Sequence, residues 1–227
     1  MESDKWCFAW FIEEAGSTGA NRQGLAKGSK WTSGDTISIS FLDGDDSLRQ
    51  KVKSIAGEWT QAGMANLNLA FVKDSTDTMI RVSFQFGGNW SLIGRDCLRR
   101  TNLELPTMNL ELTANSPDDL IRRKVLHEFG HAMGMLHEHK IPQAGIQWNH
   151  NQVVSDLSGP PNNWTADDIE NNVLRPAASD ETNFVAFDPL SIMVYPIPSN
   201  WTNDGFSVGW NTQLSPNDKA FIHTEYP

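Results

Sequence analysis

The sequence predicts an α+β fold, and three features of its apolar pattern support this prediction. Alternating or continuous apolar runs predict strands near residues 36–41, 67–73, 79–85 and 107–112. Two stretches with apolar residues at helical spacing predict long helices near residues 47–63 and 116–133. After Gly134 the pattern loosens into loops with short helices. Strands joined by a crossover helix therefore form the first part of the chain, and a loop-rich part follows.

The first predicted strand is TISISF, from Thr36 to Phe41, and a DGDD turn leads from it into the first long helix. Two further strands, LNLAFVK and MIRVSFQ, come next. The glycine-rich segment GGNWSLIG then breaks the pattern and suggests an irregular edge before the strand TMNLEL. The apolar residues that give the first helix its spacing are Leu48, Val52, Ile55, Ala56 and Trp59.

The second long helix has clear start signals. Ser116 can cap it, Pro117 suits its first turn, and Asp118 and Asp119 favour its positive end. Two short helices are expected later in the chain. Thr165 to Leu174 carries a capping pair, and SPNDKAFIHTEY opens with serine and proline near the C-terminus.

Composition restricts the partners. With 227 residues, 39% hydrophobic and 20% charged, the chain can form one large domain or two small lobes with a packed core. The net charge is -10 and the pI about 5.0, so nucleic acid and anionic membranes are poor partners. No apolar run is long enough to span a membrane. We expect a monomer.

Residues 1–30 read as a separate N-terminal segment that ends in the loop-like stretch STGANRQGLAKGSK. Its apolar patch, Trp6 to Ile12, is flanked by acids and lacks the basic start of a signal peptide. Either a signal has been removed or the protein is made without one. The two cysteines, Cys7 and Cys97, do not define a disulfide framework.

Four of the six histidines lie in the stretch LHEFGHAMGMLHEH. On a helix His127 and His131 lie about 40° apart on one face, a spacing that lets two imidazoles bind one metal ion. Glu128 lies about 60° round from His131, where it can reach a metal-bound water. His137 can join the same metal only if the chain turns back, and Gly134 permits such a turn.

The histidines His139, His150 and His223 have no such spacing. We interpret them as surface residues or as core residues with satisfied hydrogen bonds.

The motif of His127, Glu128, His131, Gly134 and His137 resembles the HExxHxxGxxH zinc motif of the metzincin metallopeptidases. The later stretch SIMVY resembles the Met-turn of that clan, with Met193 in the key place. Within the clan, Glu138 after the third histidine and Tyr195 two residues after Met193 resemble the astacins. The resemblance implies a metzincin zincin-like fold and one catalytic zinc ion.

The implied domain spans residues 31–227. Its upper lobe, 31–134, would hold a twisted mixed sheet and two long helices. Its loop-rich lower lobe, 135–227, would hold the Met-turn and the C-terminal helix. A peptide or protein substrate would lie extended in the cleft between them, along the edge segment Asn89 to Leu98.

Some positions depart from the astacin pattern. Val194 stands where astacins usually have histidine, the run after the motif reads HKIPQAGIQWN, and the usual disulfide cysteines are missing. The chain looks like a divergent microbial or fungal astacin-like enzyme, so side-chain preference is not transferred to it. The resemblance favours secretion, although a cytoplasmic location stays open without a visible signal peptide.

The predicted function is zinc-dependent endopeptidase. Three neutral imidazoles leave one zinc position open for a water whose pKa falls to about 7. Glu128 would take its proton as general base, and Tyr195 would help to stabilise the oxyanion. The resemblance also implies that Tyr195 is a fifth zinc ligand that swings away when substrate binds. The alternative is a latent or inactive zinc-bound protein that acts as a binding module, and another zinc hydrolase such as a deamidase stays open.

Several residues keep two interpretations. Tyr195 can be a buried aromatic with a satisfied hydroxyl, and Met193 can be an apolar floor under the ligands or plain core. Glu138 can anchor the N-terminus of a mature chain or be solvated. Cys7 can be an inhibitory zinc ligand, or it can pack against its aromatic neighbours Trp6, Phe8 and Phe11.

Overall fold

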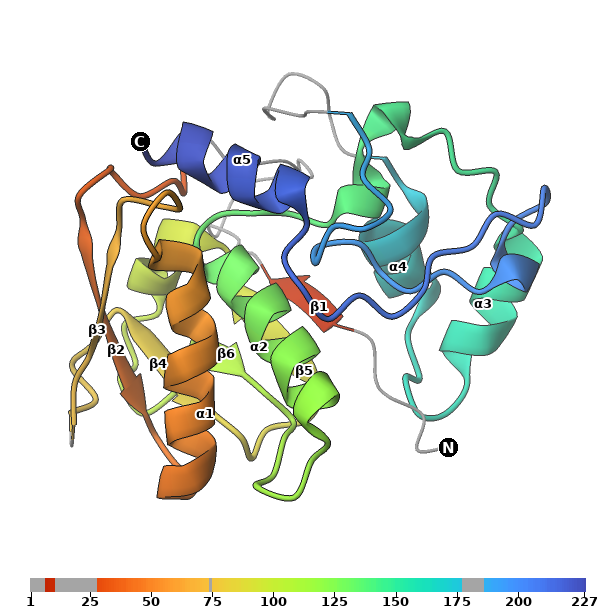
Figure 1. The fold of residues 1–227 in the computed structure, drawn as a ribbon. Helices are drawn as coiled ribbons and strands as arrows, with labels where there is room; N and C mark the ends of the chain where they lie inside the picture. Colours follow the sequence, from red (N-terminus) through yellow and green to blue (C-terminus); the bar gives the residue numbers. More distant parts are fainter. Residues whose placement is uncertain (1–6, 11–27, 74, 177–185) are drawn as a thin grey trace.

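The computed structural model describes residues 7–10, 28–73, 75–176 and 186–227 (Figure 1). A six-stranded mixed sheet has the order β1-β5-β6-β4-β2-β3. The pairs β2–β3, β2–β4, β4–β6 and β1–β5 are parallel, and β5–β6 is antiparallel. The strands are β1 (Cys7–Trp10), β2 (Thr36–Phe41), β3 (Asn68–Phe71), β4 (Ile80–Ser83), β5 (Asn89–Leu92) and β6 (Met108–Asn109).

Two long helices lie side by side over one face of the sheet, and the shorter helices lie beside or above them (Figure 1). The α-helices are α1 (Asp46–Ala56), α2 (Asp118–Ala132), α3 (His150–Ser158), α4 (Ala166–Ile169) and α5 (Pro216–Glu225). Short 3-10 turns are η1 (Gly57–Thr60), η2 (Gly94–Arg99), η3 (Glu138–Lys140), η4 (Pro142–Ala144) and η6 (Ser199–Trp201), and a π-helical turn, η5 (Glu170–Leu174), follows α4. These elements confirm the predicted α+β class.

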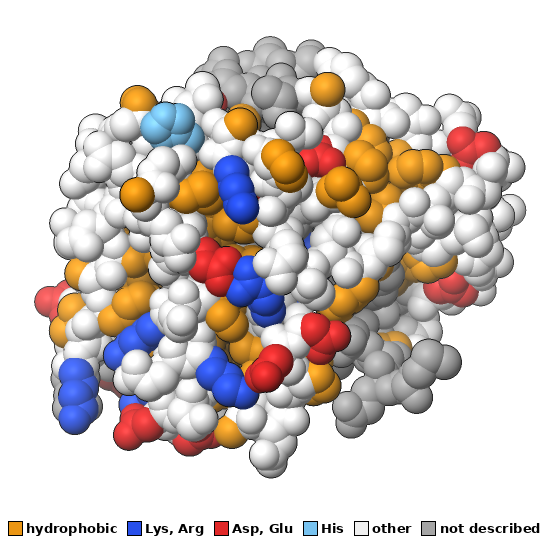
Figure 2. Space-filling model, viewed as in Figure 1, with side chains coloured by type: hydrophobic (Ala, Val, Ile, Leu, Met, Phe, Trp, Pro, Cys, Tyr) orange, Lys and Arg blue, Asp and Glu red, His pale blue; other side chains and the backbone are white. Residues whose placement is uncertain are grey.

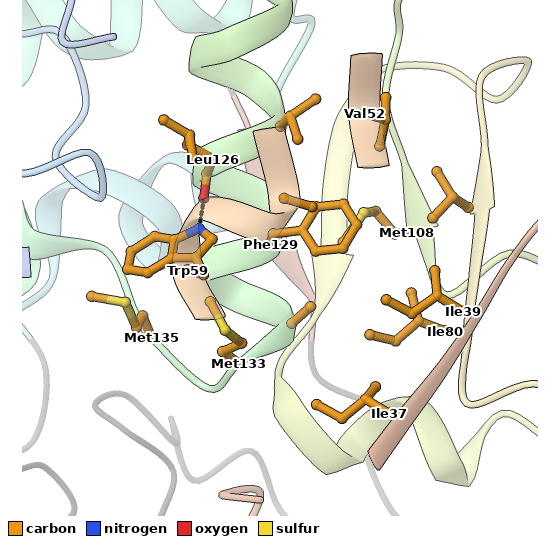
Figure 3. Close-up of a cluster of buried hydrophobic side chains, with 14 of the residues drawn as sticks. Ile37, Ile39, Val52, Trp59, Ile80, Met108, Leu126, Phe129, Met133 and Met135 are labelled. Atoms are coloured by element: carbon orange, nitrogen blue, oxygen red, sulfur yellow. Dashed lines mark hydrogen bonds between the residues drawn. The ribbon is translucent and has the colours of Figure 1, made fainter. Parts of the chain in front are cut away.

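The main core lies between the sheet and the two long helices (Figure 3). Ile39 and Ile80 project from the strands toward Phe129 of α2. Trp59 lies under the same helix, fully buried, and its indole N–H donates to the Leu126 carbonyl over 3.0 Å. Burial of a large aromatic stabilises such a core by several kcal/mol, roughly 3–5 by truncation to alanine. The helix that carries the histidines is therefore packed against the sheet and tied to the turn η1 through Trp59.

A second core packs α3, α4 and η5 against the chain near residues 194–208. Cys7 and Tyr195 belong to this second cluster. Ile222 of α5 and Tyr226 just after it belong to the first cluster instead. The division into two lobes at residue 134 stays a prediction. The C-terminal helix, which that division assigns to the lower lobe, packs against the core of the sheet.

Several predicted boundaries need correction. The histidine-bearing helix begins at Asp118 without a side-chain cap, because the Ser116 hydroxyl accepts the Thr113 N–H over 3.0 Å instead. The predicted strand at 107–112 is reduced to two residues, since Leu112 N–H turns back to the Leu110 carbonyl. The predicted capping pair Thr165–Asp168 is confirmed as a reciprocal capping box.

The predicted substrate edge, Asn89 to Leu98, is also different. Only Asn89–Leu92 forms a strand, and residues Gly94–Arg99 form the turn η2. This strand lies between β6 and β1, with Cys7 opposite Asn89 and Trp10 opposite Leu92. The side that was expected to be open is therefore covered by residues Cys7–Trp10 of β1.

The surface mixes charges of both signs. On the face shown in Figure 2, acidic and basic side chains are interspersed with apolar ones, without a continuous positive patch. Among the described residues, no helix has the length and apolar character needed to cross a membrane.

Candidate metal centre

The helix α2 and the turn after it bring three histidines together. His127 and His131 are one turn apart on the buried face of α2. Gly134 then adopts a φ of 97°, in the left-handed region that favours glycine. The Met135 N–H donates back to the Gly130 carbonyl over 2.9 Å, so the chain reverses direction and returns His137 to the helix. The predicted glycine turn is confirmed.

Cys7 completes the group. One ligand atom from each of Cys7, His127, His131 and His137 lies within 4.8 Å of every other, and all four residues are buried. Imidazole nitrogen and cysteine sulfur are a donor set that proteins use to bind transition metals. This group could therefore hold one metal ion, and it unites residues that are up to 130 positions apart in the sequence.

Backbone carbonyls orient two of the three imidazoles. His127 Nδ1 lies 2.8 Å from the Ile192 carbonyl oxygen, and His131 Nδ1 lies 2.8 Å from that of Met135. A carbonyl can only accept, so each Nδ1 carries the proton and each Nε2 presents a lone pair. Among the described residues, the buried His127 Nε2 has no hydrogen-bond partner. His131 Nε2 lies 3.0 Å from His137 Nε2. Converging lone pairs of this kind fit a cation.

The protonation states agree with metal binding. Burial lowers the pKa of His127 and His137 well below the ordinary value and lowers that of His131 to about 4. The three rings are therefore neutral near pH 7, as a ligand must be. Burial, with the nearby Glu128 carboxylate, raises the pKa of Cys7. A cation among the four groups would act in the opposite direction and favour the thiolate.

Glu128 stands beside this group. Burial raises the pKa of its carboxyl to about 8, against the lowering effects of the Cys7 thiol, Arg123 and Lys124. The Cys7 thiol lies within hydrogen-bonding reach of this carboxylate. Among the described residues, Glu128 Oε2 has no partner although it is buried. A buried carboxyl with a pKa near neutrality and a free acceptor atom suits a proton-transfer role.

The chain around Met193 forms the other wall. Met193 packs against Gly130 of α2, between His127 and His131 in the sequence. The ring of Tyr195 lies 4.3 Å from that of His137, and its hydroxyl donates a short hydrogen bond to the Cys7 carbonyl. Cys7 is therefore in contact with Tyr195 through its backbone while its side chain faces the histidines. Its predicted aromatic neighbours Trp6 and Phe11 and the side chain of Phe8 lie outside the described residues.

Two buried residues lie close to the metal group: His139, which is a core residue as one of its two interpretations expects, and Arg123, which was not singled out from the sequence. His139 stacks on Tyr195 with ring centroids 4.4 Å apart, and its Nε2 lies 3.0 Å from the Asn172 carbonyl. Arg123 is buried one turn before His127 on the same helix face. Its spacing of four residues from His127 and eight from His131 was a signal that could have indicated it.

The remaining candidates lie apart from the metal group. Glu138 accepts the Asp188 N–H over 3.1 Å, and burial raises its pKa to about 8. His150 is exposed at the start of α3. His223 is exposed on α5, with Nδ1 3.3 Å from the Met64 carbonyl. Cys97 is buried and free, so neither cysteine forms a disulfide.

The α+β fold and the buried group of three histidines and one cysteine place the protein in the class of metal-binding proteins. Comparison with solved structures narrows this class. One structure of myroilysin is 40% identical with a TM-score of 0.84, covering 89% of this chain and 97% of the other. A second is 37% identical with a TM-score of 0.71, covering 100% of this chain and 92% of the other. The chain belongs to the family of the metallopeptidase myroilysin.

No family model and no curated protein matches the sequence.

Proposed function

We propose that the protein is a zinc endopeptidase of the astacin-like metzincin group whose N-terminal segment holds it in a latent form. The observation that carries this proposal is the position of Cys7 among His127, His131 and His137. Three histidines with an open fourth position are typical of catalytic zinc, whereas a fourth protein ligand closes the site. Residue 7 would thus convert a catalytic site into a closed one.

Each residue then has a specific task. Zinc bound by the three histidines would supply a Lewis acid and lower the pKa of a water molecule. The Glu128 carboxylate would accept a proton from that water and pass it to the leaving amine. Tyr195 would donate a hydrogen bond to the oxyanion once its hydroxyl is released from the Cys7 carbonyl. It could also serve as a resting ligand, as the astacin resemblance implies.

The segment β1 would block substrate as well as metal. It pairs with β5 through the backbone, as an extended peptide would if it added to the sheet. A peptide or protein substrate would therefore replace Cys7–Trp10 along this strand. Removal of the segment would also free Glu128 from the neighbouring thiol. One cleavage would therefore open the fourth coordination position of the metal and free the base and Tyr195 together.

Other residues would support this arrangement. Gly134 would keep His137 in place by its turn, and Met193 would form the apolar floor. Glu138, half-buried beside Asp188, would receive the new amino terminus after cleavage, in the manner that the astacin resemblance implies.

The second candidate is a binding protein in which the four ligands form a permanent structural site. The closed set of Cys7 with three histidines favours it, because structural zinc sites have four protein ligands. Retention of Glu128 with an unpartnered buried oxygen favours the enzyme. The two candidates predict different results when the N-terminal segment is removed: the enzyme would gain peptidase activity, and the binding protein would not.

Casein hydrolysis by zinc-loaded proteins separates them. The intact chain, a chain that begins at Gly28, and the shorter chain with Glu128→Ala would be compared, with zinc content measured in each. We expect the shorter chain to cleave casein at least tenfold faster than the intact chain and Glu128→Ala to abolish cleavage while zinc stays bound. Glu104→Ala, at an exposed glutamate, is the matched control and should retain activity. A zinc-loaded shorter chain without activity would favour the binding protein.

A further inference from the structure

Arg123 is an unusual residue to find inside this fold. Its side chain is only 4% exposed, although guanidinium groups are rarely buried without a partner. Among the described residues, it forms no ion pair with a carboxylate. It donates instead from Nη1 to the Ile192 carbonyl and from Nη2 to the Val194 carbonyl. A buried cation that binds two carbonyls of one short segment calls for an explanation.

Those two carbonyls flank Met193. The Ile192 carbonyl also accepts the Nδ1–H of His127 over 2.8 Å. The Met193 carbonyl accepts the Glu138 N–H over 3.1 Å, directly after His137. The three consecutive carbonyls of residues 192–194 are therefore hydrogen-bonded to the segments that carry the metal-binding histidines. Arg123 donates to the first and the third of them.

The geometry of the guanidinium matters here. Its planar fork can bind two acceptors at a fixed separation, which an ammonium group cannot do. The ring of Trp210 covers the group, with the Arg123 Cζ atom 5.6 Å from the ring centroid. Burial lowers the pKa of Arg123 to about 10, so the fork remains charged near pH 7.

We propose that Arg123 is a positioning residue for the metal site. This inference rests on the proposed function, in which the histidines bind zinc. Its fork fixes the Ile192 and Val194 carbonyls relative to α2. The Ile192 carbonyl then sets the orientation and tautomer of His127. The Val194 carbonyl sets the start of the segment that places Tyr195 against His137. Outer partners of this kind typically change metal affinity by about 10- to 100-fold when they are removed.

The test uses the full chain with three substitutions. Arg123→Met removes the donors and keeps much of the aliphatic stem, and Arg123→Lys keeps the charge but not the fork. Arg122→Met is the matched control, because Arg122 lies next to it on α2 but binds Glu58, with Nη2 2.6 Å from Oε2. Zinc affinity would be measured by chelator competition, and the cobalt-substituted proteins would be compared by absorption spectroscopy.

We expect about a tenfold or greater loss of zinc affinity in Arg123→Met and a smaller but clear loss in Arg123→Lys, each with a shifted cobalt spectrum. Arg122→Met should match the parent in both measurements. If Arg123→Met does not fold, Arg123→Lys decides the matter. Parental affinity and spectrum in a folded Arg123→Lys protein would overturn the role of the fork. Failure of the parent itself to bind zinc would overturn the proposed function, and this inference with it.

Discussion

Gly130 and Met193 are in direct contact between α2 and the opposite wall of the metal centre. A Cβ atom at position 130 would overlap the Met193 Sδ atom and would lie 3.2 Å from its Cε and 3.3 Å from Trp59 Cζ2. The absence of a side chain at Gly130 therefore lets Met193 approach the backbone of α2 closely. The close packing of Met193 on Gly130 determines the distance between α2 and the segment that carries Met193.

The first prediction concerns this contact. Gly130→Ala should destabilise the fold by about 1–3 kcal/mol despite the better helix propensity of alanine, because the interior has no room for the methyl group. Chemical denaturation would measure the loss. Gly57→Ala is the control, since a Cβ there meets nothing within 4 Å and the residue is already helical. An unchanged stability for Gly130→Ala would show that Met193 can move aside freely.

The second prediction concerns the two cysteines. Cys7→Ser should raise casein cleavage by the intact chain about tenfold or more, because a hydroxyl is a far weaker zinc ligand than a thiolate. Cys97→Ser provides the comparison, since Cys97 is also free and buried but lies outside the metal group. Equal activities in the two variants, corrected for folded protein, would refute a blocking role for Cys7.

The third prediction concerns pH. Burial lowers the pKa of His139 to about 3 from its ordinary value of about 6.5. Between these values the unfolded chain binds a proton that the folded chain does not bind, so stability falls as the pH falls below about 6.5. His139→Gln retains an N–H donor for the Asn172 carbonyl but cannot titrate. Its unfolding free energy should depend less on pH between 4 and 6, by up to about 1.4 kcal/mol per unit.

This comparison would use metal-free proteins in a chelating buffer, so that zinc release does not contribute to the slope. His150→Gln, at an exposed histidine, is the matched control for the substitution itself. An equal slope in His139→Gln and the parent would mean that His139 does not remain neutral in the folded state.

The fourth prediction concerns the start of the folded domain. Trp31 is buried, and its indole N–H donates to the Ala132 carbonyl over 2.8 Å at the end of α2. Trp31→Phe should cost about 1–3 kcal/mol by leaving that carbonyl without its donor. Trp148→Phe, at a partly exposed indole outside the main core, should cost less. Chemical denaturation would measure both losses of stability. A larger loss in Trp148→Phe than in Trp31→Phe would argue that the domain begins after residue 31.

The sequence predicted best what depends on local spacing. His127 and His131 follow from helical geometry, and His137 follows from the turn at Gly134. The capping pair at Thr165 and the helix start at Ser215 and Pro216 are equally local signals, and both helices begin there with a capping box.

Features that depend on distant contacts were not predictable in this way. The strand at Cys7 exists through its pairing with β5, more than 80 positions away, so four apolar residues gave no strand signal of their own. The helix His150–Ser158 is short, with few buried residues to reveal its period. The position of Arg123 was not predicted because its carbonyl partners lie about 70 positions away in the sequence. A charged residue on a helix is also normally expected to face solvent.

X-ray absorption at the zinc edge of the intact chain tests the central claim most directly. We predict one sulfur at about 2.3 Å and three nitrogens at about 2.0–2.1 Å, with the sulfur lost in Cys7→Ser and retained in Cys97→Ser. A zinc ion with only nitrogen and oxygen neighbours in the intact chain would contradict the account, because Cys7 would then not close the site.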